Sequence, residues 1–458
     1  MASTPAPIEP TAKIKIPFFK RHPGLAQPLG GLRRWVRILG PGLVTGAADD
    51  DPSGIATYSQ AGAAFGTGQL WLALYMLPMM ITVQEMSGRI GLVTGQGIAK
   101  VLRKHYSRPV LLGAVMLVLV ANTINIGADL GAMVAATRLL VPDLPFIVCL
   151  VGFALLMVVL EIFVPYRRYA VVLKVLTLSL LAYVVTGIII GPSGWSLLRA
   201  SIVPSIQFTP AFLALVVGVL GTTISPYLFF WQASEEVEEL QKDPNAAGVK
   251  VLVRSPKVIT SQLKSLRLDT ISGMFASEVT TWFILFTTGS VLFSHGVTNI
   301  TSADQAASAL APLVHSFPNA GEVTKIVFAV GILGVGLLAV PVLAGSAAYS
   351  VAEAFGWNEG LSSTFRQARS FYLIIGGATL VGMLLNLIGI NPITALVITA
   401  VINGIVAVPL LFLILRVANN KTIMGEFTNG RLSNIIGGIT TGAMGLAAVG
   451  LLVSLFLR

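Results

Sequence analysis

Long apolar stretches separated by short polar ones recur along almost the whole chain. Each is long enough to cross the ~30 Å hydrocarbon layer of a membrane as a helix. We expect eleven such segments, near residues 39–65, 69–95, 110–137, 144–163, 169–190, 211–232, 270–294, 325–352, 371–389, 391–416 and 434–457. The pattern therefore predicts an all-α integral membrane protein.

Composition supports this class. Of the 458 residues, 55% are hydrophobic and 11% are charged, and the mean hydropathy is +0.83. Such a chain has too few polar residues to cover the surface of a soluble globule. We therefore expect a lipid bilayer as its surroundings.

The net charge of +10 reflects topology rather than a nucleic-acid partner. Basic residues precede the first segment and follow every even-numbered one, whereas the opposite loops hold only Arg138, Arg199, Lys325 and Arg458. By the positive-inside rule, we expect a multi-pass plasma-membrane protein with a cytoplasmic N-terminus and an extracytoplasmic C-terminus. Residues 1–35 read as a disordered cytoplasmic tail.

Three acids interrupt the first apolar segment. Asp49, Asp50 and Asp51 are followed by Pro52 and Gly54, and these last two residues favour a break in the helix. A charge in a spanning helix costs at least ~3 kcal/mol on insertion scales, so intramembrane acids mark functional sites. Neighbouring helical residues point about 100° apart, so the three acids cannot all ligate one ion from a regular helix.

The sixth segment is interrupted in the same way by Pro226, after Gly221-Thr222-Thr223. Interrupted helices at matching positions indicate an inverted-repeat transporter whose site lies at the bilayer midplane. We assign residues 36–192 and 193–417 to two five-helix repeats and residues 418–458 to a loop and an eleventh helix. Residues 233–268 read as a solvated cytoplasmic loop or helix.

Unwound carbonyls beside an ionised aspartate suit hard cations. An amino-acid carrier of the same architecture is the alternative from another class, although three aspartates would oppose a substrate carboxylate. No protease, nucleophile-elbow or phosphate-loop motif is present, so we expect no enzyme activity. No cofactor and no obligatory protein partner are predicted.

Several motifs resemble the NRAMP family of divalent metal-ion transporters. They are Gly40-Pro41-Gly42-Leu43 through Asp51-Pro52-Ser53-Gly54, the run from Gln84 through Ser87 and Arg89 to Val93-Thr94-Gly95, and Met424-Gly425-Glu426-Phe427 with Asn429. The resemblance covers most of residues 35–457. It implies a LeuT-like fold of five plus five helices and an eleventh, with alternating access to a midplane metal site.

The resemblance also implies which residues hold the ion. The family's Asp-Pro-Gly-Asn motif reads Asp51-Pro52-Ser53-Gly54 here, so the aspartate is kept and the asparagine is lost. The family's Met-Pro-His motif reads Ser225-Pro226-Tyr227, and its carbonyl ligand falls on Thr222. The implied metal-site positions are Asp51, Gly54, Thr222 and Ser225.

These departures bear on selectivity. A thioether favours softer transition metals, so its replacement by Ser225 makes the site harder. Replacement of the asparagine by Gly54 opens volume, which suits Mg²⁺ because this ion keeps its waters. The pattern is similar to the NRAMP-related magnesium transporters. We expect transport of Mg²⁺ and also of Mn²⁺, with ordinary Mn²⁺ or Fe²⁺ symport as the alternative.

Proton coupling is expected to be weak or absent. Tyr227, with an ordinary pKa near ~10, replaces a histidine associated with the proton route. Asp129 argues the other way, because it lies in a polar stripe with Asn122 and Asn125. It reads equally as a relay or as a buried acid satisfied by Asn125 or a neighbouring helix. Glu278 is a second candidate for the ion or proton path.

Other polar residues in apolar segments take smaller roles. Asp49 and Asp50 are candidates for a vestibule or a second ion site, and Asn403 is a candidate polar residue facing the site from the tenth segment. Glu85 and Arg89 are four residues apart on the second segment. They are expected to pair with each other.

Overall fold

The computed structural model describes residues 41–164, 178–191, 194–242, 256–314 and 319–456. The tail predicted at residues 1–35 lies outside this part. The α-helices are α2 (Pro41–Asp49), α3 (Pro52–Phe65), α4 (Trp71–Thr94), α5 (Ile98–His105), α6 (Arg108–Leu140), α7 (Phe146–Phe163), α9 (Leu181–Ile190), α10 (Gly194–Ile202), α11 (Pro210–Thr223), α12 (Pro226–Lys242), α13 (Pro256–Val291), α14 (Ala303–Ser308), α15 (Ala320–Phe355), α16 (Arg369–Leu385), α17 (Pro392–Ala418), α18 (Lys421–Met424) and α19 (Arg431–Phe456). Short 3₁₀ turns are η1 (Gly66–Gln69), η2 (Leu178–Leu180), η4 (Phe293–His295), η5 (Ala311–Val314), η6 (Asn386–Ile388) and η7 (Gly425–Phe427). The described ranges contain no β-strand.

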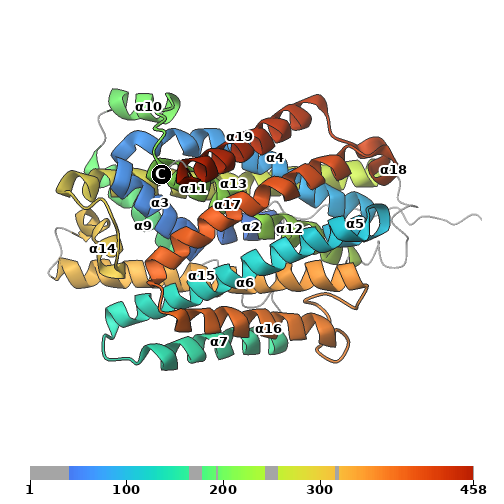
Figure 1. The fold of residues 1–458 in the computed structure, drawn as a ribbon, viewed down its shortest axis with the longest axis horizontal. Helices are drawn as coiled ribbons and strands as arrows, with labels where there is room; N and C mark the ends of the chain where they lie inside the picture. Colours follow the sequence, from blue (N-terminus) through green and yellow to red (C-terminus); the bar gives the residue numbers. More distant parts are fainter. Residues whose placement is uncertain (1–40, 165–177, 192–193, 243–255, 315–318, 457–458) are drawn as a thin grey trace, which may run out of the picture. The chain divides into compact units, whose positions relative to one another are not determined.

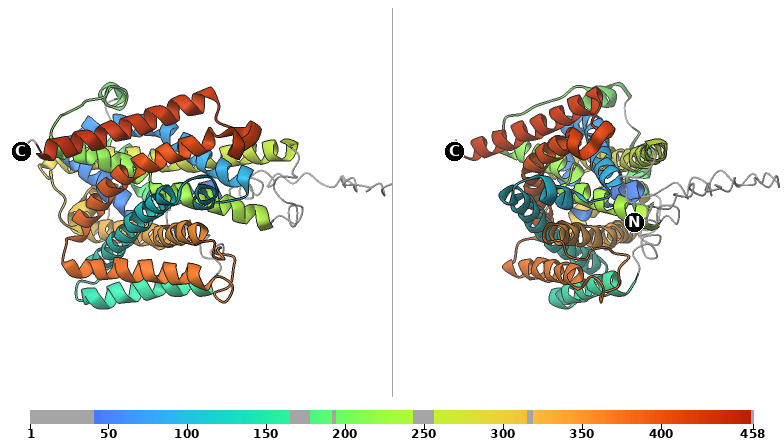
Figure 2. Two further views of the ribbon diagram at one scale, coloured as in Figure 1. Left: turned by 45° about the vertical axis from the view of Figure 1, so that its right-hand side comes forward. Right: turned by 90° about the vertical axis from the view of Figure 1, so that its right-hand side faces the viewer.

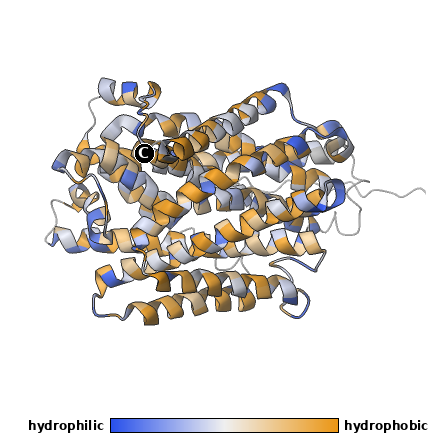
Figure 3. Cartoon of the chain, viewed as in Figure 1, coloured by the Kyte–Doolittle hydropathy of each residue, from blue (hydrophilic) through white to orange (hydrophobic). Residues whose placement is uncertain are grey.

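Each of the eleven predicted segments contains helix within the described residues. Seven helical spans there are long and apolar enough to cross a membrane, and one of them, Pro210–Gln241, joins α11 and α12. Pro52–Gln69 with Trp71–Thr94 meets the criterion as a pair bent by 109°. Helix α13 is long enough, but its first half is polar. Apolar residues dominate the long helices, while polar residues gather at their ends (Figure 3).

Both predicted breaks are present. Helix α2 ends at Asp49 and α3 begins at Pro52, with Asp51 as the N-cap of α3. Helix α11 ends at Thr223 and α12 begins at Pro226. Proline is well tolerated at the first position of a helix because the amide that it lacks would have no intrahelical partner there. The two prolines therefore restart helices.

The peripheral helices are easily followed in the views. Helices α7 and α16 lie side by side, and α6 and α15 pack together between them and the rest of the described helices (Figures 1 and 2). Only a small part of α7 is buried in the protein, and Val148 and Leu155 on it are 65% and 60% exposed. Such an exposed apolar face is expected of a helix that faces lipid.

The prediction of a solvated loop or helix at residues 233–268 was wrong for the acidic first part of this segment. Helix α12 continues to Lys242 and α13 already begins at Pro256. The side chains of Glu235, Glu236 and Glu238 are buried. Donors make this burial possible, since Gln232 bonds to Glu236 and the 361–362 backbone bonds to Glu238.

Glycines allow the broken helices to approach their neighbours at backbone distance. A Cβ on Gly273 of α13 would lie 2.3 Å from the carbonyl oxygen of Gly42 in α2, and a Cβ on Gly221 of α11 would lie 2.2 Å from the amide of Gly404 in α17. No real side chain fits at such a distance. Close glycine crossings of this kind are typical of helix packing in membranes.

We expect Gly273→Ala to destabilise the protein by about 1–3 kcal/mol, because the added methyl overpacks the crossing of α2 and α13. Thermal unfolding of purified protein in detergent would show this as a midpoint lower by several degrees. Gly376→Ala in α16 is the matched control, since its Cβ would meet nothing within 4 Å. An equal midpoint for the two variants would contradict the interpretation.

Candidate cation-binding site

The Asp51 carboxylate lies at the first helix break and is 1% exposed. Its Oδ1 accepts hydrogen bonds from the Gly54 amide and the Ser53 hydroxyl, both at 2.7 Å. Its Oδ2 accepts from Nδ2 of Asn125 in α6, at 3.0 Å. These neutral donors stabilise the buried carboxylate without a positive side chain.

The second break lies beside the first. The Thr222 hydroxyl is 3.2 Å from that of Ser53 and donates to Asp51 Oδ1 at 3.5 Å. The Ser225 hydroxyl donates to the carbonyls of Gly221 and Thr222, at 2.8 and 2.6 Å. The predicted positions Asp51, Gly54, Thr222 and Ser225 are therefore brought together, although the Ser225 proton is engaged by the backbone.

Gly54 does not open the volume that we expected. A Cβ there would lie 3.2 Å from Cε2 of Tyr58 and 3.3 Å from the Thr222 hydroxyl and from the Asp49 carbonyl. The Tyr58 hydroxyl is itself fixed to that of Thr223, at 2.8 Å. Neighbouring side chains thus fill the space next to Gly54.

Asp49 and Asp50 point to α13 rather than sharing the contacts of Asp51. The Ser277 hydroxyl lies within hydrogen-bonding distance of both, 2.7 Å from Asp49 and 3.1 Å from Asp50. Glu278 is buried next to this pair, and neither of its carboxylate oxygens has a hydrogen-bond partner in the part of the chain that the structure describes. Three buried acids therefore form a second group beside the Asp51 site.

Asp129 lies one helical turn beyond Asn125 in α6. It is fully buried, and neither of its oxygens has a hydrogen-bond partner among the described residues. The interpretation of Asp129 as an acid satisfied by Asn125 or a neighbouring helix was therefore wrong. Asn125 instead bonds to Asp51. Asp129 is close enough to Asp51 for their charges to interact.

Tyr227 and Asn403 are buried, and within the described residues neither forms a hydrogen bond with Asp51. The Tyr227 hydroxyl donates to the Ala48 carbonyl at 2.7 Å, which ties α12 to the end of α2. Asn403 lies on α17 next to Gly404, which contacts α11. Nδ2 of Asn403 has no hydrogen-bond partner within the described ranges. Tyr227 thus supports the break, while Asn403 lies on a helix that borders it.

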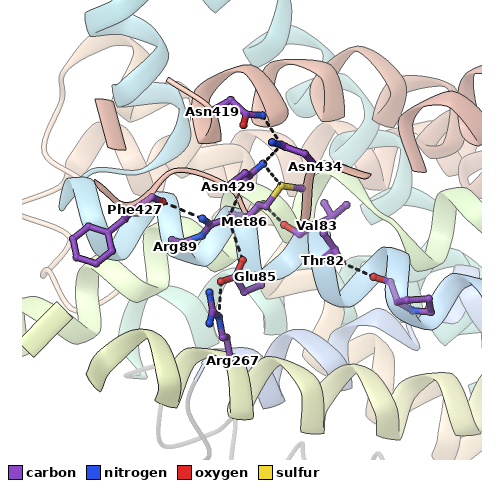
Figure 4. Close-up of polar contacts among 12 residues, drawn as sticks. Thr82, Val83, Glu85, Met86, Arg89, Arg267, Asn419, Phe427, Asn429 and Asn434 are labelled. Atoms are coloured by element: carbon purple, nitrogen blue, oxygen red, sulfur yellow. Dashed lines mark hydrogen bonds and ion pairs between the residues drawn. The ribbon is translucent and has the colours of Figure 1, made fainter. Parts of the chain in front are cut away.

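A second polar cluster links two of the motifs singled out in the sequence (Figure 4). Arg89 pairs with Glu85 at 3.2 Å, as expected, and Glu85 also accepts from Arg267 of α13 at 3.0 Å. Arg89 further donates to the carbonyl of Phe427 and to Asn429. The arginine therefore anchors the segment between α18 and α19 to α4, away from the helix breaks.

Sequence reasoning missed the two direct partners Ser53 and Asn125. Asn125 was noticed only as part of a polar stripe, and its i, i+4 spacing from Asp129 was the available signal. Among the described residues, no three acids, histidines or cysteines are grouped closely enough to hold one metal ion directly. Asp51 is therefore a single carboxylate surrounded by hydroxyl, amide and carbonyl groups.

We expect Asp51→Asn to unfold at or above the wild-type temperature and Asp51→Ala to be less stable by about 1–3 kcal/mol. Asparagine still caps α3 by accepting from Gly54, and Asn125 can turn its unpartnered Oδ1 toward the new amide. Alanine removes the cap and leaves buried donors without a partner. Thermal unfolding compares the two variants, and equal losses would show that Asp51 does not hold the break.

Comparison with known proteins agrees with this arrangement. The family described as natural resistance-associated macrophage protein-like (Nramp) matches residues 42–454. A divalent metal cation transporter MntH of Erwinia tasmaniensis is 24% identical over 87% of this chain and 90% of its own. One of Klebsiella pneumoniae is 26% identical over the same shares.

Solved structures agree on the fold. An Eremococcus coleocola manganese transporter has a TM-score of 0.72 and 17% identity, covering 94% of this chain and 88% of its own. Mhp1, a nucleobase-cation-symport-1 family transporter, has a TM-score of 0.56 and 15% identity, covering 92% and 90%. The predicted LeuT-like helical fold is thereby confirmed. With the family match spanning nearly all of the described residues, the chain belongs to the Nramp family, whose members are membrane transporters and not enzymes.

Proposed function

We propose that this protein is a secondary transporter that moves divalent metal cations into the cytoplasm by alternating access. The observation that carries the proposal is the Asp51 carboxylate at the junction of two broken helices. Carboxylate, hydroxyl and carbonyl oxygens are the ligands that hard cations prefer. The relatives named as divalent metal cation transporters support the same class of substrate.

Mg²⁺ is the favoured ion, and Mn²⁺ is carried as well. The side-chain donors to Asp51 are the hydroxyls of Ser53 and Thr222 and the Asn125 amide. The Ser225 hydroxyl bonds to the adjacent Thr222 carbonyl, and none of these groups is a sulfur or an imidazole. Without a soft ligand the site has no means to prefer transition metals over Mg²⁺. Because the space beside Gly54 is filled, the Mg²⁺ preference rests on donor softness and not on volume.

The break positions support the two proposed repeats, residues 36–192 and 193–417. Helices α2–α3 and α11–α12 each open one repeat and each restart at a proline. The basic segment ends support a cytoplasmic N-terminus in the plasma membrane. The metal ion would then reach the cytoplasm on the side of the α4–α5 and α12–α13 connections.

Proton coupling is weak or absent in this proposal. Tyr227 stands where the family carries a histidine, and its hydroxyl is committed to the Ala48 carbonyl. One observation favours the second candidate, a proton-coupled Mn²⁺ or Fe²⁺ symporter. Asp129 is buried beside Asp51 with both oxygens free of hydrogen bonds, and such an acid could carry a proton.

An organic-solute carrier is disfavoured on charge. Mhp1 shares the fold, but fold alone does not fix the substrate. Asp49, Asp50 and Glu278 lie close to the breaks, and their negative charges would oppose a substrate carboxylate.

The selectivity proposal is tested by Mn²⁺ uptake into proteoliposomes with Mg²⁺ or Ca²⁺ as competitor. We expect Mg²⁺ to inhibit Mn²⁺ uptake by the wild type and Asp51→Asn to abolish uptake. Ser225→Met adds a thioether and should weaken Mg²⁺ competition by roughly tenfold, a difference of about 1.4 kcal/mol.

Leu446→Met is the control for this experiment, because the residue is 77% exposed on α19, away from the breaks. It should leave competition unchanged. Failure of Mg²⁺ to compete with Mn²⁺ in the wild type would overturn the hard-ion proposal while leaving Mn²⁺ transport standing.

Coupling is tested with a pH-sensitive dye inside the same vesicles. We expect Mg²⁺ entry without proton influx, and we expect Asp129→Asn to retain at least half of the Mg²⁺ uptake, because no proton relay is required. The fluorescence trace and the ion uptake are measured together. A proton influx that requires both the metal ion and Asp129 would instead establish the symporter.

A further inference from the structure

A groove follows α17 on the outside of the molecule, where this helix lies between α6 and α19 (Figure 1). The apolar part of this α17 groove has a volume of about 540 Å³, and its wall includes Gly113 of α6, Leu413 of α17 and Thr441 of α19. A Cβ on Gly113 would meet nothing within 4 Å. The apolar part therefore has room for an acyl chain from the surrounding bilayer.

The α17 groove continues into a polar part at the C-terminal end of α17. Phe412 lines both parts. The polar part has a volume of about 430 Å³, and its wall also includes Tyr106, Arg416, Asn419 and Asn420. Among the described residues, no aspartate or glutamate lines either part. The wall of the α17 groove therefore carries a positive charge and no negative one.

Arg416 is the charged group at the junction of the two parts. Its guanidinium lies over the Phe412 ring, 5.1 Å from the ring centroid. Burial raises the pKa of Tyr106 and the Arg416 charge opposes this rise, so the two side chains lie near each other. Within the described ranges Arg416 forms no ion pair and no hydrogen bond. Its planar fork of N–H donors is therefore available to a ligand.

We propose that the α17 groove binds one anionic phospholipid, with the phosphate at Arg416 and an acyl chain along the apolar part. The chain alone gives little selectivity, because lipid chains are as apolar as the side chains that they would contact. The headgroup gives it, since a guanidinium binds a phosphate through two parallel hydrogen bonds. A zwitterionic headgroup also has a phosphate, but its ammonium group would find no acid on the described wall.

The position of the polar part agrees with this ligand. Tyr106 and Arg416 follow the second and the tenth apolar segments, on the side of the membrane that we propose to be cytoplasmic. Acidic lipids make the surface of the cytoplasmic leaflet negative, and basic pockets between helices on that side bind their headgroups. Helix α17 also crosses α11 at Gly404 and Gly221. A lipid in the α17 groove would therefore hold a helix that borders the second break.

The test is native mass spectrometry of the delipidated full-length protein, titrated with phosphatidylglycerol or with phosphatidylcholine that has the same acyl chains. We expect the first phosphatidylglycerol to bind about fivefold more tightly, which corresponds to the roughly 1 kcal/mol that one arginine contributes near an anionic lipid surface. Arg416→Gln should remove this difference. Gly113→Leu places a side chain in the apolar part and should weaken the binding of both lipids at least fivefold.

Each variant has a matched control outside the α17 groove. Arg369→Gln removes an exposed arginine at the start of α16, and Gly152→Leu changes an exposed glycine of α7 whose Cβ would also meet nothing within 4 Å. Neither residue lines the α17 groove. Both variants should bind the two lipids as the wild type does.

Several results would overturn the proposal. One is equal affinity of the wild type for the two lipids, and another is a preference that survives Arg416→Gln or binding that Gly113→Leu leaves unchanged. A dimer that forms without lipid and is lost in Gly113→Leu would assign the α17 groove to a second copy of the chain. Displacement of phosphatidylglycerol by an equal concentration of glycerol 3-phosphate would assign the polar part to a soluble phosphate.

Discussion

The burial of the Asp51 carboxyl group at the junction of two broken helices is the constraint on which the centre of this structure depends. A carboxylate removed from water must be given donors, and a continuous helix offers it none because its amides are already bonded. The break between α2 and α3 solves this problem, because the Gly54 amide is then free to donate to Asp51. Burial of the Asp51 carboxyl group therefore requires the break in the helix.

The same requirement explains the neighbours of the break. Ser53, Asn125 and Thr222 come from three different helices, yet each places a donor on Asp51. Their side chains are short, so the backbones that carry them have to approach closely. Glycines provide this approach between α3 and α11, since a Cβ at Gly218 would lie 3.1 Å from the Thr57 side chain and a Cβ at Gly54 would lie 3.3 Å from the Thr222 hydroxyl. The hydrogen bonds to Asp51 therefore depend on the close packing of the helices that carry its donors.

Much of this was predictable from the sequence, because helices and breaks depend on local signals. The apolar runs predicted the helices. Pro52 and Pro226 correctly predicted where a helix begins again after each break. The predictions that failed concern contacts between segments that are distant in the sequence. The burial of Glu238 rests on donors near residue 361, and the filled space at Gly54 rests on Tyr58 and Thr222. The hydrogen bond from Asn125 of α6 to Asp51 could likewise not be predicted, because a polar stripe on one helix does not show which helix it packs against.

The donors around Asp51 also bear on how strongly the site can hold its ion. A hydrogen bond to a charged group contributes about 1.5–3 kcal/mol. An ion that ligates Asp51 competes with the Ser53 and Asn125 donors, because they occupy the same oxygens. Part of the ion's binding free energy is thus offset by the loss of these bonds. The proposed transport site is therefore expected to bind weakly, which suits an abundant ion such as Mg²⁺ better than a scarce transition metal.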